Sequence, residues 1–216
     1  TVSHLRFSAS PIESTYLIDG ADFVACHQFG FLGTRDVLGI ARHGATVLLN
    51  APFPADMVWD ALPAPVQQQI IDKDLQVHAI EAHRIARESG LGGRINTVMQ
   101  PCFFALAGIL PDDEAMAANR ASLRRTYGRG GEEIVERNLR AVDLAIAALA
   151  PVPVGSAVTS TMGLRPPVPD GVPDFVERVT ARMLAGEGDL LPVSAMPIDG
   201  TFPTGTTQYE KRAIAS

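Results

Sequence analysis

A glycine-rich segment that leads into an expected helix is the part of this sequence best suited to bind a ligand. The letters G-L-G-G-R-I-N occupy positions 90–96. Glycines ahead of a helix let backbone N–H groups approach a ligand, and the helix dipole favours an anion at that end. Arg94 adds a forked donor that suits phosphate or carboxylate, and Asn96 can bond an amide or a hydroxyl. The same spacing also fits a helix C-cap followed by a tight turn, with Arg94 in a structural ion pair, so both interpretations stay open.

Other residue types that could carry chemistry give weaker patterns. Among the histidines only His27 directly follows an expected buried strand, where α/β folds bind ligands, although a structural, hydrogen-bonded histidine is the more common case. Cys26 and Cys102 lie in apolar segments without a C-x-x-C motif, which predicts buried, reduced thiols. No G-x-S-x-G motif and no metal-ligand spacing is present. We therefore expect neither a catalytic residue nor a metal site in this chain.

Strands and helices alternate over the first part of the chain, and these elements must position the glycine segment. Apolar runs bounded by turn residues predict strands over 1–8, 22–27, 45–50 and 75–80. Helical spacing predicts helices over 34–42, 56–62, 66–73 and 83–89. This alternation predicts a layered α/β domain with a mostly parallel sheet.

Beyond Gly93 the spacing becomes wholly helical. Three helices are predicted, over 94–110, 112–127 and 132–149. Pro101 lies inside the first of them, so we expect it either to kink that helix or to move its start to about Thr97. Together with the strands, these helices complete a three-layer α/β domain over residues 1–150.

An extended arm rich in Pro and Gly follows the domain over residues 151–216. Its first part, 151–173, has little apolar periodicity and is typical of a linker that lies over other surfaces. One short amphipathic helix is predicted over 174–185. The remaining tail has too little apolar content to form a core of its own, so we expect the arm to pack against something else.

The overall composition excludes several classes of protein. The chain has 216 residues, 46% of them hydrophobic and 19% charged, with a formal net charge of −6. Its Lys and Arg residues are scattered, which argues against a nucleic-acid partner. No apolar stretch approaches the roughly 20 residues that span a bilayer, and no basic-then-apolar leader is present. We therefore expect a cytoplasmic globular protein without a membrane partner.

Seven short segments form a series along nearly the whole chain. The first four read S-H-L-R-F-S with P-I at 3–12, A-D-F-V-A-C-H at 21–27, L-L-N-A-P at 48–52 and G-L-G-G-R-I-N-T-V-M-Q at 90–100. The last three read L-P-V-S-A at 191–195, D-G-T-F-P-T-G-T-T-Q at 199–208 and E-K-R at 210–212. This series resembles the pyruvate:ferredoxin/flavodoxin oxidoreductases, a family of 2-oxoacid oxidoreductases. The matched parts are the gamma-type domain and the following EKR-type segment.

The resemblance implies a large multidomain cytoplasmic enzyme, usually a homodimer, of which this chain is an internal part that is inactive alone. Such an enzyme oxidatively decarboxylates pyruvate with coenzyme A to acetyl-CoA and CO2. It uses thiamine diphosphate with Mg2+ and passes electrons through [4Fe-4S] clusters to ferredoxin or flavodoxin, and other domains hold these cofactors. The gamma-type domain is implicated in holding coenzyme A, and the arm leads to the iron–sulfur domain. The candidate coenzyme A contacts in this chain are Gly90, Gly92, Gly93, Arg94 and Asn96.

The chain departs from the family pattern at three points. It lacks the opening strand and the Gly-rich D-G-T-V-G-A-N-K loop, Gln28 stands where Asn is usual, and Pro101 stands where Thr is common.

Two alternatives for the function stay open. One is a gamma-type domain or subunit of another 2-oxoacid oxidoreductase, against which the E-K-R letters favour the pyruvate enzyme. The other is a stand-alone interaction module without catalysis, whose arm clasps a partner.

Overall fold

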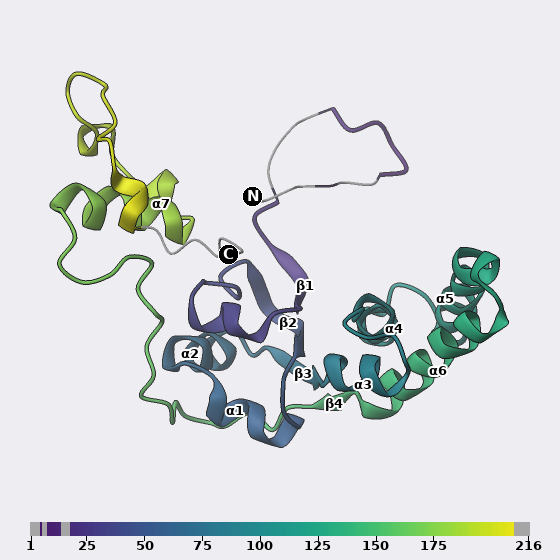
Figure 1. The fold of residues 1–216 in the computed structure, drawn as a ribbon. Helices are drawn as coiled ribbons and strands as arrows, with labels where there is room; N and C mark the ends of the chain where they lie inside the picture. The colour runs from purple at the N-terminus through teal and green to yellow at the C-terminus, as the bar shows by residue number, and fades with distance from the viewer. Residues whose placement is uncertain (1–4, 6–7, 14–17, 210–216) are drawn as a thin grey trace.

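A four-stranded sheet in the order β1-β2-β3-β4 forms the centre of the molecule (Figure 1). The computed structural model describes residues 5, 8–13 and 18–209, so most of the strand predicted over 1–8 and the E-K-R letters lie outside the described residues. The strands are β1 Ala21–Cys26, β2 Ala41–Asn50, β3 Gln76–Ile80 and β4 Ala150–Pro151. β1, β2 and β3 are parallel, and the two-residue β4 is antiparallel to β3. The prediction of a mostly parallel sheet is confirmed, and β4 is an addition to it.

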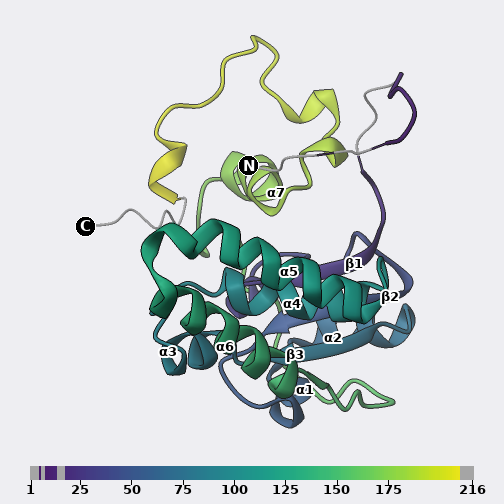
Figure 2. The same cartoon turned by 90° about the vertical axis from the view of Figure 1, so that its right-hand side faces the viewer.

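Helices cover both faces of the sheet, as Figures 1 and 2 show. On one side lie η1 Phe29–Gly33, η2 Ala55–Met57, α1 Val58–Ala61 and α2 Ala64–Asp72. On the other side lie α3 Ala82–Glu88, α4 Asn96–Ala107, α5 Asp112–Tyr127, η3 Gly128–Gly130 and α6 Glu132–Ala148. The predicted three-layer α/β architecture is therefore confirmed.

The central strand β2 shows why the sheet needs a helical layer on each side. Val47 and Leu49 pack into the core that contains α1 and α2, whereas Leu48 packs into the core that contains α3, α4 and α6. All three side chains are almost completely buried. Because successive side chains of a strand point to opposite faces, a strand that is apolar at every position must be covered twice.

The prediction of a helix over residues 34–42 is wrong. The chain forms bends and a turn there, and β2 begins at Ala41 and continues through Gly44, whose φ is +74°. Lys73 explains the difference, because its ammonium group donates to the carbonyls of Leu38 and Gly39, both at 2.8 Å. The backbone N–H of Gly44 also donates to the carbonyl of Lys73 at 2.7 Å. These long-range bonds override the local helical spacing.

The other predicted helices are confirmed to within a few residues. α4 begins at Asn96, two residues after its predicted start and next to the start at Thr97 that Pro101 led us to expect. Pro101 nevertheless lies inside α4, which continues to Ala107 and ends at Gly108 in the left-handed region, with φ +59°. A left-handed glycine is a common helix terminus because it carries no Cβ.

The arm runs from β4 past α1 and α2 before it reaches its own helical segments (Figure 1). These segments are a π-helical stretch Val176–Thr180, α7 Ala181–Ala185, and the short η5 Gly188–Leu190, η6 Val193–Ala195 and η7 Thr206–Tyr209. The helix predicted over 174–185 is thus confirmed as the first two of them. At Gly155 the arm passes so close to Trp59 that an added Cβ would lie 2.7 Å from the indole nitrogen.

The fully buried Gln67 of α2 attaches the arm to the domain. Its Oε1 accepts hydrogen bonds from the backbone N–H groups of Thr159 and Ser160, both at 2.9 Å. Its Nε2 donates to the carbonyl of Trp59 at 2.7 Å. One amide side chain therefore joins α1, α2 and the arm, and its burial makes these bonds costly to lose.

Asn50, at the carboxyl end of β2, makes a similar connection among the strands. Its Nδ2 donates to the carbonyl of His27, just after β1, at 2.9 Å. Its Oδ1 accepts from the buried backbone N–H of Ala82, just after β3, at 3.0 Å. The Asn50 side chain thus holds the carboxyl ends of three parallel strands in one arrangement.

We predict that Gln67→Leu releases the arm, because two arm N–H groups lose their buried acceptor. In the intact protein, amide hydrogen exchange of peptides spanning 156–162 should accelerate at least tenfold, which corresponds to about 1.4 kcal/mol of lost local protection. The control is Gln68→Leu, since the exposed Gln68 side chain bonds, among the described residues, only to Asp72 of its own helix. Equal exchange in the two variants would contradict the role of Gln67.

We predict that Asn50→Ala and Asn50→Asp differ at α3. Alanine leaves the Ala82 N–H without an acceptor, so exchange of peptides spanning 80–84 should rise about tenfold or more. Aspartate keeps an acceptor for Ala82 but places a buried carboxylate oxygen against the carbonyl of His27, so peptides around 27 should change more than peptides spanning 80–84. If both variants give the same exchange pattern, the two hydrogen bonds do not act separately.

Candidate functional site

The glycine segment closes α3 with a helix-ending turn. The N–H of Leu91 donates to the carbonyl of Ala86 at 2.7 Å, and the N–H of Gly90 donates to that of Arg87 at 3.0 Å. Gly90 itself has φ +74°, which a residue with a Cβ adopts only under strain. This pair of bonds is the Schellman arrangement, so the C-cap interpretation of Gly90 is confirmed.

The middle of the segment, residues 92–94, is open to solvent, whereas Leu91 and Ile95 are buried. Gly92, Gly93 and Arg94 are exposed, and a Cβ added at either glycine would meet nothing within 4 Å. Within the described part of the chain, the N–H groups of Gly92 and Gly93 have no protein acceptor. Arg94 makes no ion pair there, and its Nε donates only to the carbonyl of Leu91, at 3.4 Å. The expected structural ion pair is therefore absent from the described residues, and the guanidinium is available to an anion.

α4 begins directly after this turn and presents its positive end to it. The carbonyl of Ile95 accepts the N–H groups of Val98 and Met99, which closes the first turn of the helix. No acidic residue lies in that turn to neutralise the helix dipole. An anion held by Arg94 would thus also gain from the partial positive charge at the start of α4.

A shallow pocket of about 290 Å³ lies along the first two turns of α4. Its lining consists of residues at or just after the carboxyl end of β1, in β2 and on one face of α4: Ala25, His27, Leu48, Asn96, Met99, Gln100 and Phe103. Parallel α/β sheets bind ligands beyond the carboxyl ends of their strands, and this pocket has that position. Phe103 is fixed there by edge-to-face contacts with Phe23, at 4.9 Å between ring centroids, and with Phe104, at 5.3 Å.

The structure brings together some of the residues that the sequence singled out. His27 and Asn96 line the same pocket although they are far apart in sequence. Of the described residues, Gly90, Gly92, Gly93 and Arg94 are not in its lining and lie on the turn before α4. Sequence reasoning missed Gln100 and Phe103. The spacing of Asn96 and Gln100, four residues apart, was the one available signal that they share a helix face.

The two side-chain amides that α4 contributes to this pocket suit binding, and the imidazole of His27 also lines it. Asn96 and Gln100 contribute neutral amides, which can both donate and accept hydrogen bonds. Met99, Phe103 and Leu48 supply apolar surface beside them. The arrangement can hold an uncharged chain that carries amide groups, next to an anion bound at the turn.

The two cysteines are buried and unpaired, as the sequence predicted. Burial raises the pKa of the Cys26 thiol above its ordinary value, and its Sγ–H donates to the carbonyl of Gln28 at 3.1 Å. Burial also raises the pKa of Cys102 to about 12. Because the thiolate is the reactive form, neither side chain is suited to act as a nucleophile near neutral pH.

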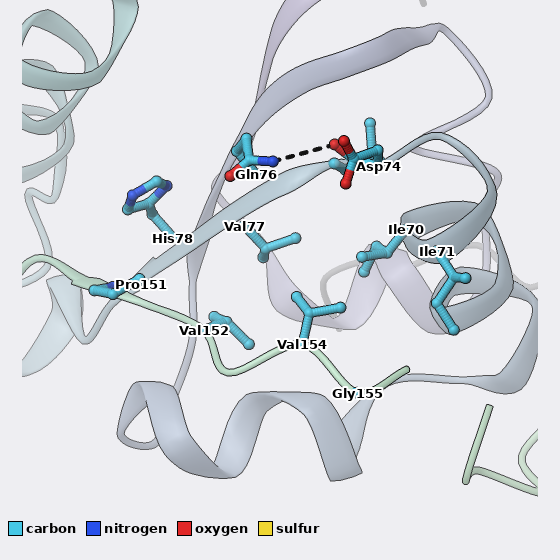
Figure 3. A pocket seen from close by; sticks show the side chains of 11 residues that line it. Ile70, Ile71, Asp74, Gln76, Val77, His78, Pro151, Val152, Val154 and Gly155 are labelled. Carbon is cyan, nitrogen blue, oxygen red and sulfur yellow. Dashed lines mark hydrogen bonds between the residues drawn. The ribbon is translucent and has the colours of Figure 1, made fainter. Parts of the chain in front are cut away.

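A second pocket, of about 360 Å³, lies where β4 ends and the arm departs (Figure 3). Figure 3 shows the side chains of Ile70, Val77 and Val154 around it, with Asp74 and Gln76 at one side. Gln76 Nε2 donates to the backbone carbonyl of Asp74 at 3.3 Å. The lining of this second pocket is largely aliphatic and contains none of the residues that the sequence predicted to bind a ligand.

Two further findings concern only the residues that the structure describes. No group of three or more His, Cys, Asp or Glu side chains in residues 5, 8–13 and 18–209 is arranged to hold a metal ion. None of the helices in these ranges has the length and apolar content to cross a membrane.

Known proteins match this chain over its full length. The curated relatives include a pyruvate-flavodoxin oxidoreductase of Rhodospirillum rubrum, 54% identical over 215 residues. A probable pyruvate-flavodoxin oxidoreductase of Escherichia coli is 48% identical, and a pyruvate:ferredoxin oxidoreductase of Moorella thermoacetica is 40% identical. Each alignment covers 100% of this chain and 18% of the relative. The chain therefore spans about a fifth of the length of these proteins.

A solved structure and two family models complete the comparison. Pyruvate oxidoreductase subunit PORC of Thermotoga maritima superposes with a TM-score of 0.48 at 16% identity, covering 62% of this chain and 66% of that one. Residues 161–215 match the EKR family, described as a domain of unknown function. Residues 1–148 match the model described as pyruvate ferredoxin/flavodoxin oxidoreductase. On this match and on the identity with its relatives, the chain belongs to the pyruvate ferredoxin/flavodoxin oxidoreductase family.

Proposed function

We propose that the intact protein oxidatively decarboxylates pyruvate with coenzyme A to acetyl-CoA and CO2, and passes the electrons to flavodoxin or ferredoxin. The observation that carries this proposal is the 54% identity over the whole chain with a protein named pyruvate-flavodoxin oxidoreductase. The names of the other matched relatives also support pyruvate over a different 2-oxoacid. A cytoplasmic location and a homodimeric assembly are parts of the same proposal.

Within that enzyme, we assign residues 1–150 to a gamma-type domain and residues 151–216 to an arm that leads towards an iron–sulfur domain. The contacts of Gln67 with Thr159 and Ser160 support an arm that is anchored on the domain rather than free. Beyond these contacts the arm carries exposed apolar side chains such as Leu190, Val193 and Ile198. Such residues suit a segment that packs against other domains of the same enzyme.

The residues of this chain do not fit the iron–sulfur clusters of the proposed reaction. A [4Fe-4S] cluster takes four cysteine thiolates, and this chain has two cysteines, both buried. We therefore assign the clusters to other domains of the enzyme, and we propose the same for thiamine diphosphate with its Mg2+. No step of the chemistry is assigned to a residue of this chain.

The part that we propose for this chain is to hold coenzyme A. The turn offers the N–H groups of Gly92 and Gly93 and the guanidinium of Arg94, which have no acceptor or ion-pair partner among the described residues beyond the Leu91 carbonyl, and the start of α4; all of these favour a phosphate. Coenzyme A also carries an uncharged chain with two amide groups. Asn96 and Gln100 can bond these amides in the adjacent pocket, while Phe103 packs against the chain of the coenzyme. Gly90 contributes by ending α3 so that the turn can form.

We predict that Arg94→Gln in the intact enzyme raises the KM and the Kd for coenzyme A about tenfold. The physical reason is the loss of one charge-assisted hydrogen bond to a phosphate at an exposed site. The kcat and the KM for pyruvate should stay near their original values, because Arg94 does not contact the reacting atoms. Steady-state kinetics with a viologen acceptor, together with calorimetric titration of coenzyme A, measures these quantities.

Arg87→Gln is the matched control, since Arg87 is also exposed but lies in the last turn of α3. If Arg94→Gln and Arg87→Gln leave the Kd for coenzyme A equally unchanged, the turn is not the phosphate site. In that case the activity proposed for the intact enzyme would still stand, because it rests on the relatives and not on Arg94.

A further inference from the structure

A groove on the α1–α2 side of the sheet is separate from the turn and pocket described above. It consists of two adjoining hollows of about 400 and 240 Å³, which share Thr34 and Arg165. The larger hollow lies between η1, the connection Ala61–Pro63 and the arm at Met162. The smaller one continues past Arg35 to Pro166, Pro167 and Leu184 of the arm.

Two arginines are the charged residues in the lining of this groove. Arg35 and Arg165 both border the smaller hollow, and of the described residues that line it or the larger one, none is acidic. Within the part of the chain that the structure describes, neither arginine belongs to an ion pair. The groove therefore holds two uncompensated positive charges in a chain whose net charge is −6.

One contact positions the side chain of Arg35, and another positions the backbone of Arg165. The guanidinium of Arg35 lies 5.7 Å from the centre of the Phe31 ring, a cation–π contact. The backbone N–H of Arg165 donates to the carbonyl of Gly33 at 2.8 Å, which holds the arm against η1. Two forked donors that enter one hollow from different segments can share the oxygens of a single anion.

The larger hollow supplies apolar walls next to these charges. Phe29, Leu32 and Met162 line it, and Leu32 is almost fully buried. Phe29 is fixed by an edge-to-face contact with Phe53, at 5.1 Å between centroids. If an organic anion binds at Arg165, its apolar part can therefore lie in the larger hollow.

We propose that this groove binds a small organic anion, with a phosphate or carboxylate held by Arg35 and Arg165 and an apolar body held beside Phe29 and Met162. The inference does not depend on the proposed enzymatic function, since the groove shares no lining residue with the α4 pocket. It depends on the arm, because Met162 and Arg165 complete the site.

The test uses phenyl phosphate and benzoate as probes, in calorimetric titrations of the intact protein. Arg35→Gln and Arg165→Gln should each weaken binding of the preferred probe about five- to tenfold, as expected for one charge-assisted bond at an exposed site. Tighter binding of phenyl phosphate would assign a phosphate ligand, and tighter binding of benzoate a carboxylate. Benzyl alcohol, which has the ring without the anion, should bind more weakly than either probe and should respond to neither substitution.

Two control variants separate this groove from other basic sites. Arg94→Gln should leave probe binding at the groove unchanged, and so should Arg87→Gln on α3. The proposal is overturned if neither probe binds the parent protein, if Arg35→Gln and Arg165→Gln bind as tightly as the parent, or if Arg94→Gln alone abolishes binding. Near-ultraviolet circular dichroism of each variant shows whether a loss of binding reflects a loss of fold.

Discussion

The hydrogen bonds of Asn50 are the interaction on which the arrangement of the α4 pocket depends. Parallel strands end side by side, but their following loops have no ladder bonds to keep them together. Asn50 closes this gap by donating to the carbonyl of His27 and accepting from Ala82. The end of β1 and the start of α3 are thereby fixed relative to β2. The glycine turn follows α3, so the pocket and the turn share one support.

Much of this fold can be predicted from sequence because its strongest signals are local. The apolar run of β2 and the periodic spacing of α5 and α6 are properties of neighbouring residues, and their predicted positions are confirmed. The helix predicted over 34–42 is wrong because the contacts that decide its structure are distant in sequence. Its helical spacing is real, but the bonds from Lys73 to Leu38 and Gly39 join residues more than 30 positions apart, and no local pattern contains them.

The candidate site shows the same division between local and distant information. A turn that ends a helix and exposes Arg94 is encoded in adjacent residues, so the glycine segment could be singled out from sequence. That His27 meets Asn96 and Gln100 in one pocket depends on the parallel order of β1 and β2 and on how α4 crosses them. The role of Asn50 was equally hidden, because an asparagine at a strand end looks like an ordinary turn residue until its two partners are known.

The arm changes what the α1–α2 side of the domain can do. η1 and the connection after α1 form one wall of the larger hollow, and the arm forms the other. Gln67 fixes Thr159 and Ser160 of the arm, and Gly33 fixes Arg165, so a surface becomes a walled groove. The sites on the two helical layers therefore differ in their polar groups: the pocket at α4 contains two amides, and the groove at η1 contains two arginines. Since the sheet separates them, a ligand on one side can leave the other side free, although β1, which precedes both His27 and η1, and β2, which packs into both cores, connect the two sides.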